Sequence, residues 1–144
     1  MDIPLYEDLD GHIALVTGAT RGIGKRIADG LVNHGATVYA GARDTADITD
    51  DDREGIELDV TVDDQRVAAI DRINQEAGQL DILVNNAGVM DSRGSLNEMS
   101  TETIETTLAT NLHGPIQLTK QPSIYCCRSR APASSRLLGT GRDH

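Results

Sequence analysis

Short apolar runs alternate with longer amphipathic stretches over the first 120 residues of the chain. Continuous apolar runs are typical of strands buried on both faces of a sheet, whereas apolar spacing of three or four predicts a helix. The pattern predicts strands over residues 12–18, 36–43, 55–60 and 80–88. It predicts helices over residues 21–35, 61–78, 95–114 and 115–121. This alternation indicates an α/β fold, a doubly wound parallel sheet truncated after about four strands.

The expected helices carry start and stop signals. In the first helix the apolar side chains that share one face are Ile23, Ile27 and Leu31. In the second helix the residues at core spacing are Val67, Ile70 and Ile73. Gly35 is the candidate cap at the end of the first helix, and Thr61 or Asp63 would start the second. Ser100 gives a partial start signal for the third, because a capping box would place Glu or Gln at position 103.

The composition is acidic, with a formal net charge of −10 over 144 residues. This charge argues against nucleic acid as a partner, because phosphate backbones require clustered Lys and Arg. Asp supplies 16 of the 23 acidic residues, while Lys occurs only twice. Such a surface is typical of salt-adapted proteins, and an acidic mesophilic protein is the equal alternative. No apolar run approaches the roughly 20 residues that span a bilayer, and the N-terminus lacks signal-peptide features, so we expect a cytoplasmic protein without a membrane partner.

The stretch TGATRGIG, residues 17–24, joins the first expected strand to the first helix. Gly18 suits a tight turn, and Gly22 and Gly24 allow close approach of backbone and helix. The N-terminus of the helix then presents unpaired N–H groups and a positive dipole end to a phosphate. A glycine-rich turn in this context indicates a nucleotide site. The alternative is a tight turn that binds nothing.

Four motifs together resemble the short-chain dehydrogenase/reductase family over about residues 10–120. They are TGATRGIG, LDV at 58–60, NNAG at 85–88 and TN at 110–111. The resemblance implies a Rossmann-like fold and hydride transfer between a nicotinamide cofactor and a small-molecule carbonyl or alcohol substrate. Homo-oligomers are possible on the same ground. For the asparagines of NNAG the alternative is a structural role, since Asn suits tight turns without a ligand.

The resemblance also assigns residues. The expected cofactor-binding residues are Gly18, Thr20, Arg21, Gly22, Ile23, Gly24, Arg43, Asp59, Val60, Asn86, Ala87 and Gly88. Asn111 matches the asparagine that holds a water in the proton relay of the family, and is the one expected catalytic residue. No metal site is expected, because the four histidines and the adjacent Cys126 and Cys127 lack ligand spacing.

The end of the second expected strand favours NADP over NAD. A carboxylate there would hydrogen-bond the ribose 2′-hydroxyl of NAD, whereas an arginine accommodates the 2′-phosphate of NADP. This chain has Ala42 and Arg43 at that place, and Arg21 lies in the glycine-rich turn. Two guanidinium groups suit a phosphate well. The alternative is that Arg43 pairs with an aspartate of the following loop, Asp44 or Asp47.

The charge changes sign near residue 122. Residues 1–122 carry nine Lys and Arg against 22 Asp and Glu, whereas residues 123–144 carry four Arg and one Asp. We expect residues 1–122 to form the N-terminal part of an NAD(P)-binding domain. Residues 123–144 are expected to be an atypical tail, either disordered or out of frame after a shift near Gln121.

The catalytic Ser and the Tyr-x-x-x-Lys pair of the family are missing from this sequence. Four residues after Tyr125 stands Ser129, and Lys120 precedes the tyrosine. We therefore expect a truncated, catalytically deficient oxidoreductase, with a non-catalytic dinucleotide-binding protein or a non-functional fragment as alternatives. Without a fifth strand the fourth would expose an apolar edge, which predicts marginal stability.

Overall fold

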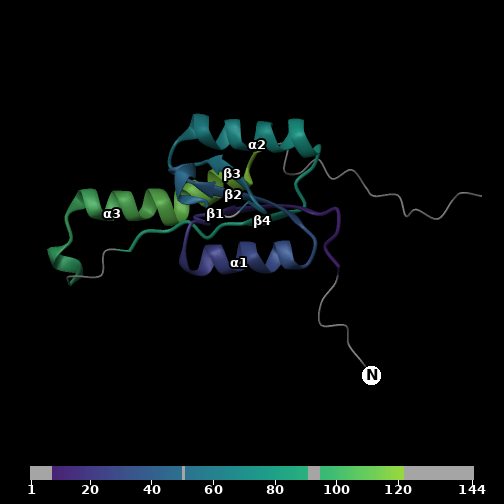
Figure 1. The fold of residues 1–144 in the computed structure, drawn as a ribbon. Helices are drawn as coiled ribbons and strands as arrows, with labels where there is room; N and C mark the ends of the chain where they lie inside the picture. The colour runs from purple at the N-terminus through teal and green to yellow at the C-terminus, as the bar shows by residue number, and fades with distance from the viewer. Residues whose placement is uncertain (1–7, 50, 91–94, 122–144) are drawn as a thin grey trace, which may run out of the picture.

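The computed structural model describes residues 8–49, 51–90 and 95–121, and within these ranges the chain forms one parallel sheet. The strands are β1 (Ile13–Thr17), β2 (Thr37–Ala42), β3 (Glu54–Glu57) and β4 (Ile82–Val84). Their order in the sheet is β3-β2-β1-β4. Helix α1 (Gly22–Asn33) covers one face and α2 (Asp63–Ala77) the other (Figure 1). The doubly wound α/β fold is thus confirmed, and the expected tail at 123–144 lies outside the described residues.

The two faces of the sheet pack against cores of different kinds. On the α1 face the buried side chains are small, namely those of Ala14, Val16, Ala28, Val38 and Ala40. On the α2 face they are larger and include those of Leu15, Tyr39, Ile56, Ile70, Ile73 and Leu118. Small side chains let a helix approach a sheet closely. Helix α1 therefore lies tight against β1 and β2, and its first turn follows directly on the turn after β1.

Two apolar residues of the expected helix faces, Ile23 and Val67, are exposed. Ile27 and Leu31 pack against the core, but Ile23 is 73% exposed. Ile23 lies in the first turn of α1, where it lines the cavity described below. Val67 is 39% exposed because the inward face of α2 passes through Arg66, Ala69, Ile70 and Ile73.

A nearly continuous helical stretch follows β4. It consists of α3 (Thr101–Leu108), a π-helical segment (Ala109–His113) and α4 (Gly114–Thr119). Ser100 caps α3 by accepting a hydrogen bond from the Thr103 N–H at 3.1 Å, so the partial start signal was sufficient. Helix α3 projects away from the sheet (Figure 1), whereas Leu118 of α4 is fully buried in the core on the α2 face. No helix in the described ranges combines the length and apolar character needed to cross a bilayer.

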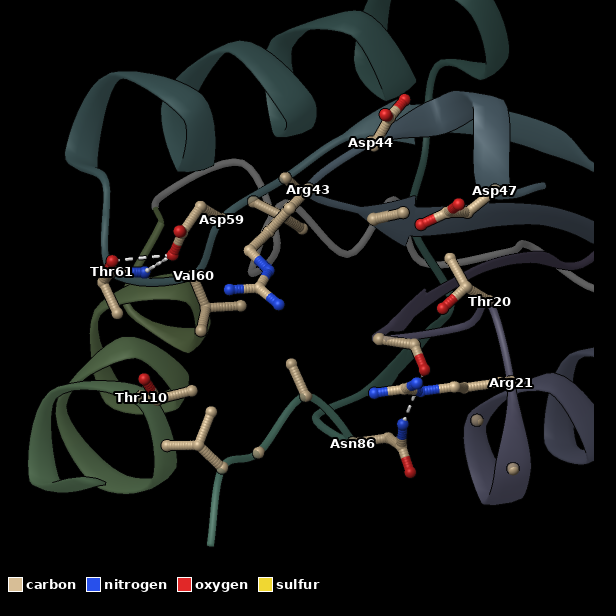
Figure 2. Close-up of a pocket in the computed structure, with 18 of the residues that line it drawn as sticks. Thr20, Arg21, Arg43, Asp44, Asp47, Asp59, Val60, Thr61, Asn86 and Thr110 are labelled. Carbon is tan, nitrogen blue, oxygen red and sulfur yellow. Dashed lines mark hydrogen bonds between the residues drawn. The ribbon is translucent and has the colours of Figure 1, made fainter. Parts of the chain in front are cut away.

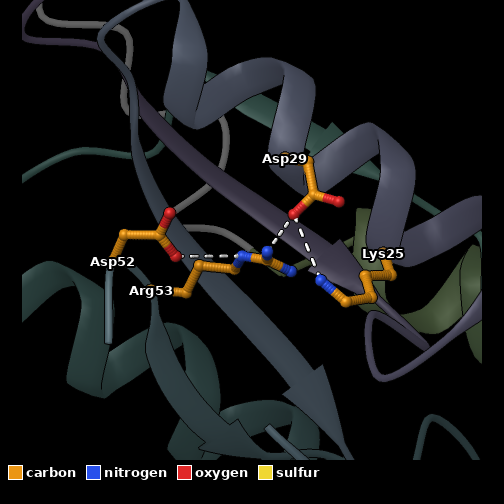
Figure 3. A network of polar contacts seen from close by, with 4 residues as sticks. All are labelled: Lys25, Asp29, Asp52 and Arg53. Carbon is orange, nitrogen blue, oxygen red and sulfur yellow. Dashed lines mark hydrogen bonds and ion pairs between the residues drawn. The ribbon is translucent and has the colours of Figure 1, made fainter. Parts of the chain in front are cut away.

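Charged side chains fasten the start of β3 to α1 (Figure 3). The guanidinium of Arg53 pairs with the Asp29 carboxylate on α1, and its Nε lies 3.4 Å from Asp52 Oδ1. Asp29 Oδ1 also lies 3.4 Å from Lys25 Nζ. The side chain of Arg53 is almost fully buried, and a buried cation is stable only where acceptors surround it. This cluster therefore ties the loop between β2 and β3 to the helix that begins at the glycine-rich turn.

Strand β4 pairs with β1 on one side, and the described residues supply no strand for its other side. Its side chains, Ile82, Leu83 and Val84, are only partly buried, whereas those of the neighbouring β1 are buried throughout. An open parallel edge leaves backbone N–H and C=O groups without ladder partners. Marginal stability of the chain by itself stays a prediction.

Candidate functional site

A cavity of about 1140 Å³ lies at the carboxyl end of the sheet, at the point between β1 and β4 where the strand order changes direction. In open α/β sheets, ligands bind at this switch point. All twelve expected cofactor-binding residues line the cavity. Figure 2 labels six of them, Thr20, Arg21, Arg43, Asp59, Val60 and Asn86. The lining residues that the sequence analysis did not single out as binding are Ala42, Asp44, Asp47, Leu58, Thr61, Val89, Thr106 and Thr110. Two of these residues could have been identified from the sequence, because Thr61 follows the LDV motif and Thr110 precedes Asn111.

The glycine-rich turn contacts the loop after β4 without room for side chains. Gly18 has a φ of +65°, and a Cβ there would lie 2.9 Å from the Cα of Ala87. A Cβ on Gly24 would collide with Asn86 Nδ2 and with the carbonyl oxygen of Gly18. Glycine at these two positions therefore sets the distance between two walls of the cavity.

The N-terminus of α1 opens into this cavity. Its N-cap residue, Arg21, forms no side-chain cap hydrogen bond, and its first turn contains no acidic residue. Gly22, Ile23 and Gly24 of this turn all line the cavity. Uncapped N–H groups and the positive end of the helix dipole suit an anionic group.

The hydroxyl of Thr17 anchors the loop after β4. Thr17 Oγ1 accepts hydrogen bonds from the N–H groups of Asn86 at 3.0 Å and Ala87 at 2.9 Å, and donates to the Val84 carbonyl at 3.3 Å. Asn86 Nδ2 in turn donates to the carbonyl oxygens of Thr17 and Gly18, both at 3.0 Å. Asn86 therefore has a structural role, because its amide holds two loops together, and its contact with a cofactor stays a prediction. Thr17 was visible in the sequence as the first residue of TGATRGIG, but its anchoring role was not.

The turn between β3 and α2 forms a further wall. The predicted strand over 55–60 ends at Glu57, and the following residues turn toward the cavity. Asp59 Oδ1 accepts hydrogen bonds from Thr61 N at 2.9 Å and from Thr61 Oγ1 at 2.6 Å. The prediction that Thr61 or Asp63 caps α2 is wrong: Val62 is the N-cap, and Thr61 is bonded to Asp59.

Ionisation of Asp59 is favoured in the folded chain. Partial burial acts to raise its pKa, but the hydrogen bonds from Thr61 and the charges of Arg43 and Arg66 outweigh burial, so the pKa is lowered. On α2, the hydrogen bond from Arg72 is the main cause that lowers the pKa of Glu76. Both carboxylates therefore stabilise the folded state in their ionised form.

A loss of stability in acid follows from these two carboxylates. A lowered folded-state pKa contributes stability above the ordinary pKa, and this contribution disappears as pH falls through the folded-state value. We expect the thermal midpoint to be level near neutral pH and to fall below about pH 4. Thermal unfolding followed by circular dichroism between pH 7 and pH 3 measures this. Asp59→Asn and Glu76→Gln should each reduce the acid-induced fall, and a fall unchanged in both variants would contradict the assignment.

Two arginines extend toward the middle of the cavity, Arg43 from the end of β2 and Arg21 from the glycine-rich turn (Figure 2). No ion pair joins Arg43 to Asp44 or Asp47 in the part of the chain that the structure describes. Asp44 instead accepts a hydrogen bond from the Ala46 N–H at 2.9 Å, which starts a short 3-10 turn over Thr45–Asp47. The alternative of a local Arg43–Asp pair therefore finds no support.

Asn111 lies beside the cavity without lining it. Its Oδ1 accepts a hydrogen bond from Val89 N at 2.8 Å, and its Nδ2 donates to Val89 O at 2.7 Å. It is held in the π-helical segment, next to the lining residue Thr110. The amide thereby fixes the loop after β4, and a part in proton relay stays a prediction.

The family model described as short chain dehydrogenase matches residues 12–129. The chain belongs to this family. A short-chain dehydrogenase relative, the 3-oxoacyl-[acyl-carrier-protein] reductase of Vibrio cholerae, is 40% identical over 119 residues, which are 78% of this chain and 48% of that protein. The family resemblance read from the four motifs is thus confirmed.

Solved structures of short-chain dehydrogenases superpose on this chain. A metagenomic short-chain oxidoreductase in complex with NADP has a TM-score of 0.72 and 34% identity, over 78% of this chain and 55% of that one. The 3-ketoacyl-(acyl-carrier-protein) reductase from Brucella melitensis, complexed with NADH, has a TM-score of 0.73 and 28% identity, over 77% and 48%. The chain therefore spans about half the length of the relatives it matches.

The described residues contain no candidate metal site. Across residues 8–49, 51–90 and 95–121, no group of three or more His, Cys, Asp or Glu side chains is arranged to hold an ion.

Proposed function

We propose that this chain binds NADP(H) in the cavity at the carboxyl end of its sheet and provides the nucleotide-binding part of a short-chain dehydrogenase. The observation that supports this most is that all twelve residues expected from the motifs line one cavity, with the uncapped N-terminus of α1 opening into it. The donors and charges fit a dinucleotide, with N–H groups for the diphosphate and two guanidinium groups for a 2′-phosphate.

Each wall has its own part in this proposal. From the family resemblance we assign the diphosphate to the turn at Gly22 and Gly24 and the adenine to Asp59 with Val60, all of which line the cavity. Asn86, Ala87 and Gly88 line the ribose and nicotinamide side. When bound, the nicotinamide carries a hydride to or from a carbonyl or alcohol group of a small-molecule substrate.

We further propose that the chain as printed binds the cofactor without turning over a substrate. A short-chain dehydrogenase reaction needs a Tyr acid/base beside a Lys, and this sequence has no Tyr-x-x-x-Lys. A non-catalytic dinucleotide-binding protein is the second candidate, favoured by the twelve expected cofactor-binding residues that line one cavity. A cytoplasmic location, salt adaptation and homo-oligomers stay predictions from composition and family.

The cofactor preference is tested by titrating the purified chain with NADPH and with NADH. We expect saturable binding of both and tighter binding of NADPH. Arg43→Ala should weaken NADPH binding about tenfold and leave NADH binding within about twofold, because a charge-assisted bond to phosphate is lost. Isothermal calorimetry and the increase in NAD(P)H fluorescence measure this.

Arg26→Ala is the matched control, since Arg26 is exposed on α1 and does not line the cavity. It removes the same charge and should leave both affinities unchanged. Equal losses of NADPH affinity in the two variants would mean that Arg43 acts only through net charge. A wild-type chain that binds neither nucleotide would overturn the proposed function.

A further inference from the structure

Arg66 is a buried cation in the first turns of α2. Only 6% of its surface is exposed. Its Nη1 donates to the carbonyl oxygen of Val60 at 2.6 Å, and its Nη2 donates to Asp63 Oδ1 at 2.7 Å. A guanidinium is costly to bury unless such acceptors surround it. The acceptors therefore account for its inward position on a helix whose other inward residues, Ala69, Ile70 and Ile73, are apolar.

The carbonyl that Arg66 holds belongs to a wall of the cavity. Asp59, Val60 and Thr61 all line it, and Arg66 bonds to the middle residue of the three. The charge of Arg66 also favours the ionised form of Asp59, in addition to the hydrogen bonds from Thr61. Arg66 thus holds the backbone of this wall in position, and its charge adds to the larger effects of Thr61 and Arg43 on Asp59.

Val60 is confined from a second direction. A Cβ placed on Gly114, the first residue of α4, would lie 2.7 Å from Val60 O and 2.9 Å from Val60 Cγ2. The backbone of α4 therefore packs directly on Val60. Arg66 and Gly114 together leave Val60 little freedom to move toward or away from the cavity.

We infer that Arg66 is a positioning residue for the adenine end of the nucleotide site, acting through the Val60 carbonyl. This inference rests on the proposed function. It adds to that function that Arg66, which does not line the cavity, contributes to the binding free energy of the nucleotide. Loss of the Arg66 bond would free the Val60 turn, and ordering that turn would then cost part of the binding free energy.

The same helix offers a matched control in Arg72. Arg72 Nη1 donates to the carbonyl of Gly55 at 2.7 Å, and its Nε donates to Glu76 Oε1 at 2.8 Å. Like Arg66, it bonds one backbone carbonyl near β3 and one carboxylate of α2. None of its partners lines the cavity. Arg72→Met should therefore lower stability while leaving nucleotide affinity intact.

The experiment compares Arg66→Met and Arg72→Met with the wild-type chain. The ligands are NADPH and adenosine 2′,5′-bisphosphate, which contains the adenine end without nicotinamide. Binding is measured by calorimetry at a temperature where circular dichroism shows all three proteins folded. We expect Arg66→Met to weaken both ligands by the same factor of about ten, equivalent to one charge-assisted hydrogen bond. Arg72→Met should bind both within about twofold of wild type.

The outcomes separate this inference from the proposed function. A wild-type chain that binds neither ligand overturns both. Wild-type binding with unchanged affinity in Arg66→Met, or with equal losses in the two variants, overturns the inference alone. If Arg66→Met does not fold, Arg66→Gln replaces it. The glutamine amide is shorter than the guanidinium and cannot bond Val60 and Asp63 at the same time. Weakened binding of both ligands to Arg66→Gln supports the inference, and wild-type affinity overturns it.

Discussion

Replacing Gly24 by alanine is expected to abolish nucleotide binding and to destabilise the chain by about 3 kcal/mol. The new Cβ would collide with Asn86 Nδ2 and with the Gly18 carbonyl oxygen. The Gly18 oxygen belongs to the backbone, so it cannot rotate away as a side chain would. The first turn of α1 must then move outward, together with the N–H groups that face the cavity. Thermal unfolding and NADPH titration measure the two effects.

Gly30 provides the control within the same helix. A Cβ on Gly30 meets nothing within 4 Å, and Gly30 lies in the interior of α1. Because glycine is a poor helix former, Gly30→Ala should stabilise the chain by up to about 1 kcal/mol and leave NADPH affinity unchanged. If Gly30→Ala stabilises the chain and Gly24→Ala destabilises it, the loss of stability in Gly24→Ala comes from the collision of the new Cβ with Asn86 and Gly18. If Gly24→Ala binds NADPH normally, the close approach of the turn to Asn86 is not required.

The arrangement of the sheet was predictable because its strands are almost continuously apolar. A run such as IALVT has to be buried on both faces, which a parallel sheet covered by helices on both faces achieves. The ends of the elements were less predictable. The third strand was expected to reach Val60 but ends at Glu57, because the Asp59 N–H donates to the Gln65 side chain on α2 instead of to a neighbouring strand.

The lining of the cavity was predictable where backbone geometry demands a residue type. Gly18 and Gly24 are fixed by contacts that exclude a Cβ, and such positions are visible as glycines in a sequence. Arg66 and Thr17 were not identified as supports of the site, since the bonds that join them to its walls go to backbone carbonyl and N–H groups, which carry no sequence signal. Helical periodicity placed Ile23 on one face with Ile27 and Leu31, but it does not tell that this face lines the cavity at Ile23 and packs on the core at the other two.

Thr17→Val should destabilise the chain by about 3 kcal/mol and weaken nucleotide binding more than tenfold. Thr17 is only 1% exposed, and valine has nearly the same shape, so the change removes the hydroxyl with little change in packing. The Ala87 N–H would lose its acceptor, and the Asn86 N–H and the Val84 carbonyl would each lose one bond and keep the 3.1 Å bond that joins them. Unsatisfied buried groups cost more than the bonds themselves contribute. Thermal unfolding and NADPH titration measure both quantities.

Thr107→Val is the matched control, because the Thr107 hydroxyl donates only to the Thr103 carbonyl one turn earlier in α3. We expect its stability to change by no more than about 0.5 kcal/mol and its NADPH affinity to stay at the wild-type value. A loss in Thr17→Val no larger than in Thr107→Val would show that the loop after β4 is held without the Thr17 hydroxyl. A large loss of stability with normal NADPH affinity would instead separate the anchoring of this loop from the binding of the nucleotide. The two measurements together therefore decide whether the hydroxyl that closes β1 onto β4 also shapes the cavity between them.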